Sequence, residues 1–139
     1  REIKVADRKS VPVVVDEESS IYDAIVTMFL EDVSTIFVTS NGYLSGVVSR
    51  KDFLKNAIGG LDLYKTPIGV IMTRMPNIVV TTLEETVLEA AIKLIEHEVD
   101  SIPVVEVVST DGEEKVYKVV GRITKTTITR LFVDLGNNE

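Results

Sequence analysis

The 139-residue sequence contains no cysteine and no tryptophan, and it has a single histidine. Without cysteine there is no disulfide framework and no thiolate metal site, and one histidine is too few for a histidine-rich metal centre. No apolar run approaches the roughly 18 residues that a membrane-spanning helix needs. The net charge of -7 argues against direct nucleic-acid binding, because phosphate neutralisation needs a basic face. These absences favour a cytoplasmic protein with no metal site and no membrane partner, and we find no set of residues typical of an enzyme.

What the sequence does contain is a repeat. An apolar pattern at positions i, i+3, i+4, i+7 and i+8 occurs twice, 66 positions apart, and predicts two helices with one buried face each. The first helix carries Ile21, Ala24, Ile25, Met28 and Phe29, and the second carries Val87, Ala90, Ala91, Leu94 and Ile95. Ser20 with Asp23, and Thr86 with Glu89, predict matching helix starts.

The segments around these helices repeat as well. Strands are predicted at 11–15, 36–38 and 44–48 in the first half and at 78–81, 102–108 and 116–120 in the second. A second helix follows each hairpin, from Ser49 to the glycine pair at 59–60 and from 124 to 135, ending at Gly136; residues 66–72 predict a short linking helix. The distance from Val38 to Gly46 is 8 positions and from Val104 to Gly121 it is 17. We therefore expect nine extra residues in an exposed polar loop around Asp111-Gly112.

The predicted fold is of the α/β (α+β) class, with two β-α-β-β-α repeats at 1–65 and 66–139. One repeat alone exposes a face of its small sheet and buries too little apolar surface. We expect the two repeats to pack sheet to sheet about a pseudo-twofold axis.

One candidate binding motif lies at the end of the third strand of the first half, Gly46-Val47-Val48-Ser49-Arg50-Lys51-Asp52. Glycine permits close approach to the backbone, a helix start offers free N–H groups to phosphate, and a carboxylate accepts hydrogen bonds from the two hydroxyls of a ribose. The alternative interpretation, which the heptad alone favours, is that Ser49 and Asp52 only form a capping box.

The repeated order, with Ser101-Ile102-Pro103-Val104-Val105 before one hairpin and Gly46, Ser49 and Asp52 after the other, resembles tandem CBS domains. The resemblance covers nearly the whole chain, from about Val5 to Leu135. The stretches at 27–33 and 70–77 are most similar to the C-terminal module of the Bacillus-type catabolite-control repressors of gluconeogenic genes, which carry an N-terminal DNA-binding domain. That domain is absent from this chain, which starts with Arg1.

The resemblance implies a nucleotide cleft between the repeats. The residues it assigns to an adenine nucleotide (ADP, ATP or AMP, with magnesium as an optional companion of the phosphates) are Ser49, Arg50, Lys51, Asp52, Asn77, Ile78, Ser101, Ile102 and Pro103. Ser49 and Asp52 would hold the ribose, and the phosphates would lie toward Arg50 and Lys51, with Arg74 or Arg122 as further candidates. The adenine would lie among Asn77, Ile78, Ser101, Ile102 and Pro103.

The second copy of the motif departs from the family pattern, since Thr127 stands where the ribose aspartate belongs. A neutral hydroxyl binds a diol more weakly than a carboxylate does. We therefore expect a weaker, altered or empty second site, made of Val11, Thr35, Ile36, Arg122, Thr124 and Thr127.

The sequence thus predicts the nucleotide-sensing module of a transcriptional repressor, a homodimer through the apolar residues at 61–71 and at Ile128, Leu131 and Phe132, with DNA bound only through the absent domain. Two alternatives stay open: a CBS module regulating an enzyme or channel, and a ligand-free structural dimerisation module.

Overall fold

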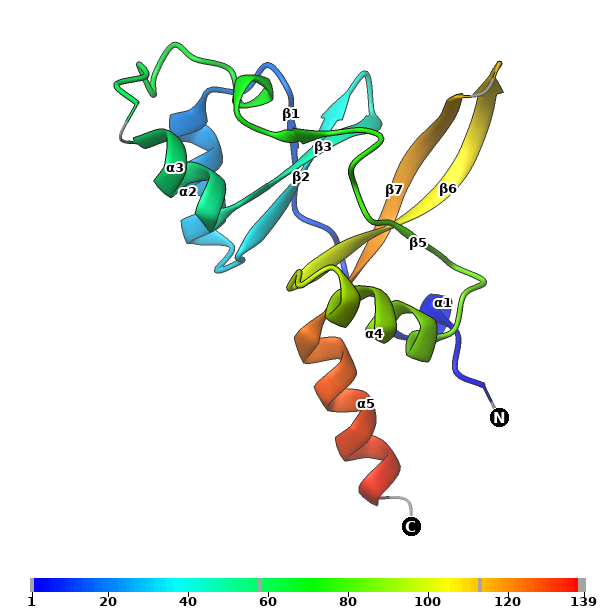
Figure 1. Cartoon of the computed structure of the whole chain (residues 1–139). Coiled ribbons are helices and arrows are strands. Elements are labelled where there is room, and N and C mark those ends of the chain that lie inside the picture. Colours follow the sequence, from blue (N-terminus) through cyan, green and yellow to red (C-terminus); the bar gives the residue numbers. More distant parts are fainter. Residues whose placement is uncertain (1, 58, 113, 138–139) are drawn as a thin grey trace. The chain divides into compact units, whose positions relative to one another are not determined.

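The computed structural model of the chain describes residues 2–57, 59–112 and 114–137. These residues form short helices and strands in an alternating order (Figure 1). The elements are α1 (Val5–Arg8), β1 (Val14–Asp16), α2 (Ile21–Leu30), β2 (Thr35–Ser40), β3 (Tyr43–Ser49), α3 (Arg50–Ala57), the 3-10 turn η1 (Ile68–Val70), β4 (Thr73–Arg74), β5 (Thr81–Thr82), α4 (Val87–Glu96), β6 (Ser101–Asp111), β7 (Glu114–Thr124) and α5 (Lys125–Asn137).

The predicted α/β class and the β-α-β-β-α order of each repeat are confirmed. Strand β1 pairs parallel with β2, which pairs antiparallel with β3, and β5 pairs parallel with β6, which neighbours β7. The predicted helix starts are also confirmed, because the Ser20 hydroxyl accepts from the Asp23 N–H and the Thr86 hydroxyl from the Glu89 N–H, each at 3.0 Å. Asn41 and Gly42 have φ of 53° and 86°, the left-handed turn that the sequence predicts for the first hairpin.

Several boundaries differ from the sequence-based prediction. The link predicted as a helix at 66–72 is only the turn η1, the strands predicted at 11–15 and 78–81 lie at 14–16 and 81–82, and α5 continues through Gly136 to Asn137. Gly136 lies in helical backbone and not in the left-handed conformation that ends a helix. Strand β4 and helix α1 were not predicted.

The nine extra residues of the second hairpin do not form the polar loop that we expected. Strand β6 continues to Asp111 and β7 begins at Glu114, so most of the insertion lengthens both strands. Val107, Val108 and Val116 already lie in the predicted strands and favour strand, and the two strands continue from them through the polar residues at 109–111 and 114–115.

The chain forms two compact units, each discontinuous in sequence. The first-repeat unit comprises Val13–Ile78 and Val108–Lys118. The second-repeat unit comprises the chain up to Pro12, Val79–Val107, and the chain from Val119 onward.

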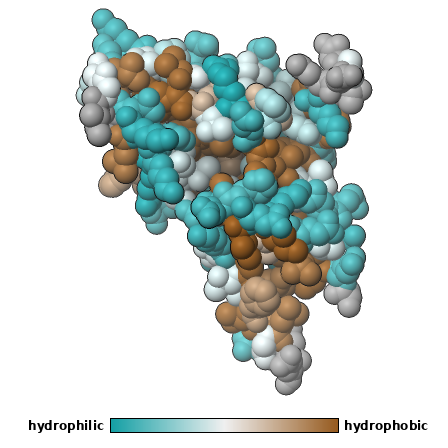
Figure 2. Space-filling view, viewed as in Figure 1, coloured by the Kyte–Doolittle hydropathy of each residue, from teal (hydrophilic) through white to brown (hydrophobic). Residues whose placement is uncertain are grey.

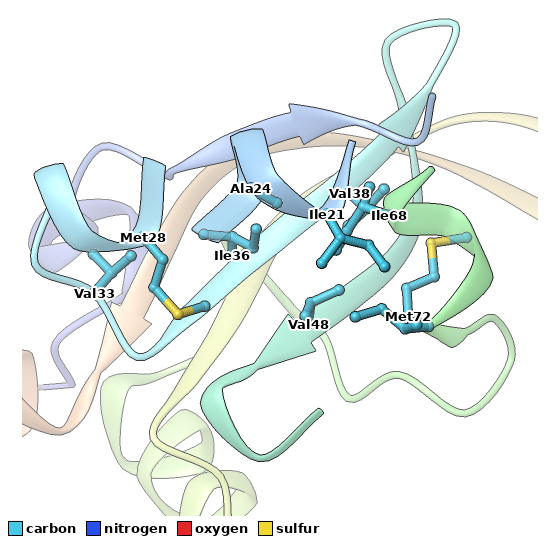
Figure 3. Close-up of a cluster of buried hydrophobic side chains, with 10 residues drawn as sticks. Ile21, Ala24, Met28, Val33, Ile36, Val38, Val48, Ile68 and Met72 are labelled. Atoms are coloured by element: carbon cyan, nitrogen blue, oxygen red, sulfur yellow. The ribbon is translucent and has the colours of Figure 1, made fainter. Parts of the chain in front are cut away.

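Each unit has its own core, and equivalent positions fill both. In the first-repeat unit, α2 packs through Ile21, Ala24 and Met28 (Figure 3). Its partners are Val33, Ile36, Val38, Val48, Ile68, Ile71 and Met72. The core of the second-repeat unit contains Val5, Ala90, Leu94, Ile102, Val104 and Ile123.

Two residues of the predicted buried stripes are not buried. Phe29 is 82% exposed and Ile95, its equivalent 66 positions later, is 76% exposed. At 100° per residue the i+8 position lies about 80° from position i, at the margin of the stripe that faces the core. Prediction of burial at these two positions was wrong for this reason.

The segments that lead into the repeats are exchanged between them. The Val5 N–H donates to the Glu85 carbonyl at 2.8 Å, so the segment ahead of the first repeat packs in the second-repeat unit. The Ile68 N–H donates to the Ser19 carbonyl at 2.7 Å, so the segment ahead of the second repeat packs in the first-repeat unit. Ser19 and Glu85 are equivalent, 66 positions apart.

The exchange extends beyond one hydrogen bond. The Ala6 N–H donates to the Leu83 carbonyl at 3.1 Å, and the Gly69 N–H donates at the same distance to the carbonyl of Glu17, the equivalent of Leu83. Val5 and Ile68 are both 0% exposed, each in the core of the unit that receives it. The exchange explains why the compact units are discontinuous.

Candidate functional site

The first motif forms a compact loop between β3 and α3. The Ser49 N–H donates to Oδ2 of Asp52 at 2.8 Å, and the Ser49 hydroxyl donates to the same oxygen at 3.2 Å. The Asp52 side chain therefore accepts from the Ser49 N–H, which is one of the two hydrogen bonds of a capping box. Both hydrogen bonds use Oδ2 of the carboxylate, and among the described residues no hydrogen bond to Oδ1 is found; both side chains are only half-buried.

Strand β4 and the residues next to it pass close to β3 just before this loop. Strand β4 pairs with β3 at Gly46 and Val47, opposite Arg74 and Thr73. A side-chain carbon at Gly46 would lie 2.8 Å from the Thr73 carbonyl oxygen and 2.7 Å from Cγ of Met72. The motif needs glycine at this position because the link before the second repeat crosses it in van der Waals contact.

Positive charge surrounds the loop unevenly. Arg50 and Lys51, in the first turn of α3, are exposed. Arg74 is held within its unit, since its guanidinium donates to the Gly69 carbonyl at 2.9 Å and lies 3.7 Å from a Glu17 carboxylate oxygen. Arg50 and Lys51 are therefore better placed than Arg74 to meet a phosphate, whose charge also favours the N-terminal end of a helix.

The residues that the resemblance assigns to the base lie in the link between β4 and β5 and at the start of β6. Asn77 and Ile78 belong to the first-repeat unit with the motif, and Ile78 is buried. Ser101, Ile102 and Pro103 open β6, in the second-repeat unit. The Ile102 side chain is in the core, so this position offers backbone groups, whereas the Ser101 hydroxyl is buried with no hydrogen-bond partner in the described part of the chain.

The second motif has the same backbone form without the charge. The Thr124 N–H donates to the Thr127 hydroxyl and the Thr127 N–H donates to the Thr124 hydroxyl, each at 3.2 Å. Thr127 is 9% exposed. Its hydroxyl serves as a reciprocal helix cap, and no carboxylate takes the place of Asp52.

The surroundings of the second motif are basic. Arg122 exchanges main-chain hydrogen bonds with Ser10, and its Nε donates to the Ser10 hydroxyl at 3.2 Å. The Lys125 ammonium lies 2.7 Å from an Asp100 carboxylate oxygen. Among the other residues expected here, Val11 is 81% exposed, Thr35 opens β2, and Ile36 is fully buried in the core of the first-repeat unit.

Sequence reasoning missed the residues that cross the motif glycines. The Lys9 side chain lies on Gly121 as Met72 lies on Gly46, because both belong to the exchanged segments. The sequence does carry a signal of these equivalent segments, because Val5 and Ile68 are 63 positions apart and Lys9 and Met72 have the same spacing. This spacing differs from the helix repeat of 66, so the register of the helices does not reveal it.

Other site types find no support. Within residues 2–57, 59–112 and 114–137, no group of three or more acidic or histidine side chains is arranged to hold a metal ion. In the same residues, no helix combines the length and apolar character needed to cross a membrane.

Comparison with known proteins agrees with this geometry. The family model of the CBS domain matches residues 5–59 and 68–134. The "Transcriptional repressor CcpN" of Bacillus subtilis (strain 168) is 47% identical over 140 residues, which is 100% of this chain and 64% of that protein. The mitochondrial "CBS domain-containing protein CBSX3" of Arabidopsis thaliana is 28% identical over 64% of this chain and 45% of its own length. The chain thus spans less than two thirds of these relatives.

Solved structures share the fold over the whole chain. The CBS domain pair of protein MJ0100, in complex with 5-methylthioadenosine and S-adenosyl-L-methionine, superposes with a TM-score of 0.77 at 26% identity and 100% coverage of both chains. The structure of CBSX2 in complex with AMP has a TM-score of 0.76 at 24% identity, covering 96% of this chain and 98% of that one. A CBS pair is a regulatory module, which confirms that the chain is not an enzyme. Repeat order, motif geometry and these matches together show that the chain belongs to the CBS domain family, as a tandem pair of CBS domains.

Proposed function

We propose that this CBS pair senses an adenine nucleotide, with the ribose on Ser49 and Asp52, and regulates transcription through a DNA-binding domain outside this chain. The observation that carries the proposal is the loop between β3 and α3. It presents a half-buried carboxylate with one oxygen held by Ser49 and the other available to a diol. Exposed Arg50 and Lys51 follow at the start of α3, where phosphate charge is favoured.

A second observation supports a ligand at the base end. The Ser101 hydroxyl is buried without a partner, and a buried polar group without a hydrogen bond is costly. A base nitrogen or amino group would satisfy it. Two structures that share this fold are complexes with adenine nucleosides or nucleotides: 5-methylthioadenosine and S-adenosyl-L-methionine with the MJ0100 pair, and AMP with CBSX2.

The regulatory output is proposed from the repressor relative. CcpN matches this chain at 47% identity and extends beyond the matched region. The net charge of -7 makes the CBS pair itself unsuited to bind DNA, so DNA binding belongs to another domain in this proposal. We place the whole protein in the cytoplasm.

Isothermal titration of the chain with AMP, ADP, ATP and S-adenosyl-L-methionine, each with and without Mg²⁺, tests the proposal. We expect saturable binding of an adenine nucleotide, weakened about tenfold or more by Asp52→Ala, equivalent to roughly 1.4 kcal/mol. Thr127→Ala is the matched control, since it removes the equivalent helix cap of the second motif. Thermal unfolding of both variants checks that the fold is intact.

Unchanged affinity in a folded Asp52→Ala protein would remove the ribose assignment. No binding of any of the four compounds would favour the alternative of a ligand-free dimerisation module. Binding of S-adenosyl-L-methionine alone would favour a metabolite sensor of another kind.

We also propose that the chain forms a homodimer, through exposed apolar side chains that include only part of the set the sequence suggested. Of that set, Ile68 and Ile71 enter the core of their own unit and Leu131 is 7% exposed, whereas Tyr64, Val70 and Phe132 are exposed. Several exposed apolar side chains lie on helices, and Figure 2 shows apolar surface over α5. They include Leu88, Ile92 and Ile95 on α4, Phe132 on α5, and Tyr22 and Phe29 on α2.

On α2 and on α4, each within its own unit, the exposed apolar residues form a second stripe, and the two stripes share equivalent positions, 22 with 88 and 29 with 95. Isolated exposed apolar residues are ordinary, but a contiguous stripe marks an interaction surface, and a repeated surface suits a twofold partner. Sedimentation velocity checks the assembly: we expect a dimer that Ile95→Glu converts to monomer, while Val11→Glu, at an exposed site away from the helices, leaves it intact. A monomeric wild-type chain would refute the proposal.

A further inference from the structure

The second hairpin is longer than the first, and the extra residues are strand. Strands β6 and β7 have 11 residues each, against 6 in β2 and 7 in β3 (Figure 1). Loops tolerate insertions without consequence, but an extended hairpin must satisfy its backbone hydrogen bonds and place its side chains.

The tip of this hairpin belongs to the other repeat. Residues Val108–Lys118 are part of the first-repeat unit, whereas the parts of β6 and β7 nearer the motif belong to the second-repeat unit. Within the first-repeat unit, Lys118 of β7 pairs antiparallel with Tyr43 of β3. The hairpin is therefore a covalent ribbon whose base packs with one repeat and whose tip pairs with the other.

The paired residues occupy equivalent positions. Tyr43 stands six residues before Ser49, and Lys118 stands six residues before Thr124. Strand β3 continues without interruption from Tyr43 to Ser49, directly before Asp52, and β7 continues from Lys118 to Thr124, directly before α5. A continuous path of strand backbone thus joins the first motif to α5.

We propose that the extended β6–β7 hairpin is a strap that transmits occupancy of the Ser49–Asp52 site to helix α5. The proposal rests on the nucleotide binding proposed above. A ligand on Ser49 and Asp52 restrains the end of β3, and the pairing of Tyr43 with Lys118 extends the restraint to β7. Helix α5 follows β7 directly and carries the exposed Phe132, so a change in α5 reaches a surface available to a partner.

Coupling of this kind requires that nucleotide binding at Ser49 and Asp52 change the free energy with which α5 opens. Hydrogen exchange of the α5 amides measures it. AMP, ADP and ATP are added in turn to the wild-type chain and to a shortened chain, in which residues 106–119 are replaced by Ser-Asn-Gly-Tyr-Leu. These five residues occupy positions 40–44 of the first hairpin and restore its length.

Two further variants make the comparison decisive. In the matched control, residues 109–116 are replaced by Asn-Gly, which shortens the hairpin but keeps Lys118. In a second shortened chain, residues 107–118 are replaced by Asn-Gly, so that misfolding at one junction does not decide the result. All variants are titrated with nucleotide before exchange is measured.

In wild type and control, we expect nucleotide to slow α5 exchange about fivefold or more, the lower end of usual coupling between sites. In both shortened chains, binding is expected to persist while the α5 response is lost. Three results would each overturn the strap: a wild-type chain that binds without an α5 response, a shortened chain that keeps the response, or a folded shortened chain that no longer binds. A wild-type chain that binds no nucleotide removes the proposed function, and the strap with it.

Discussion

Replacement of Ile68 by alanine tests the exchange of leading segments. Ile68 is 0% exposed and precedes the second repeat in sequence, yet it packs with Ile21 and Val38 in the core of the first-repeat unit. If the exchange holds, Ile68→Ala must weaken the repeat that comes before it in sequence. The mirror change, Val5→Ala, must weaken the second-repeat unit, because Val5 packs there with Ala90 and Leu94.

The magnitudes follow from the atoms removed. Ile68→Ala deletes three carbons at about 0.8 kcal/mol each, and the incompletely collapsed cavity raises the loss to about 3.5 kcal/mol. Val5→Ala deletes two carbons, for about 2.5 kcal/mol with its cavity. The matched controls are Val70→Ala, in the same turn as Ile68 but 62% exposed, and Val11→Ala, 81% exposed; each should change the free energy of unfolding by less than about 0.5 kcal/mol.

Urea denaturation gives the total loss, and native-state hydrogen exchange gives its location. With Ile68→Ala, the amides of α2 and β2 should exchange faster by a larger factor than those of α4 and β6. With Val5→Ala, the order should reverse. Local opening of one unit ahead of global unfolding makes such a difference measurable.

The reasoning fails if Ile68→Ala accelerates exchange mainly in α4 and β6, the helix and strand that follow it in sequence. That result would mean that each leading segment stabilises its own repeat. Equal acceleration everywhere would mean that the two units unfold only together, and the location of the effect would then carry no support for the exchange.

Three glycine-to-alanine substitutions have different expected outcomes because the surroundings of the three glycines differ. Gly46→Ala should disrupt the β3–β4 pairing and destabilise the chain by about 2 kcal/mol or more, because the added carbon meets the Thr73 carbonyl at 2.8 Å. Gly121→Ala should destabilise the chain by less than about 1 kcal/mol, since the flexible Lys9 side chain can move aside. Thermal unfolding compares the two variants, and equal losses of stability would contradict the argument. Gly136→Ala should stabilise the chain by up to about 1 kcal/mol, because Gly136 lies within α5 and a carbon added there meets nothing within 4 Å. A lower unfolding temperature in the last variant would show that Gly136 ends the helix after all.

The periodic elements were predictable because their signals are local. The stripe at Ile21, Ala24 and Met28, and the caps at Ser20 and Thr86, depend on residues three to eight positions apart. The contact of Ser49 with Asp52 was predictable for the same reason, since positions i and i+3 meet at the start of a helix. The repeat then supplied the second copy of each element.

The exchange and the strap could not be predicted in this way. Val5 stands alone between Lys4 and Ala6 without a helical stripe, and the choice of the repeat that buries it is tertiary. Phe29 and Ile95 show the complementary failure, because a hydrophobic residue at the edge of a stripe can face the core or a partner with the same local pattern. The hairpin extension was misassigned because the polar residues at 109–111 and 114–115 indicate a loop by composition, whereas in the structure they continue the two strands.

The exchanged segments also bear on how such a chain arises. A half-length ancestor with one repeat would have its leading segment displaced from its own core position, and a second copy would supply the missing one. Two such chains would form a dimer by mutual exchange of their N-terminal segments, the low-cost route to symmetric dimers. Joining the two genes end to end preserves every exchanged contact, with Val5 and Ile68 as the two former equivalents. A cut between positions 65 and 66 would therefore yield two fragments that each lack the segment which fills its core in the intact chain, and mixing them would restore both cores.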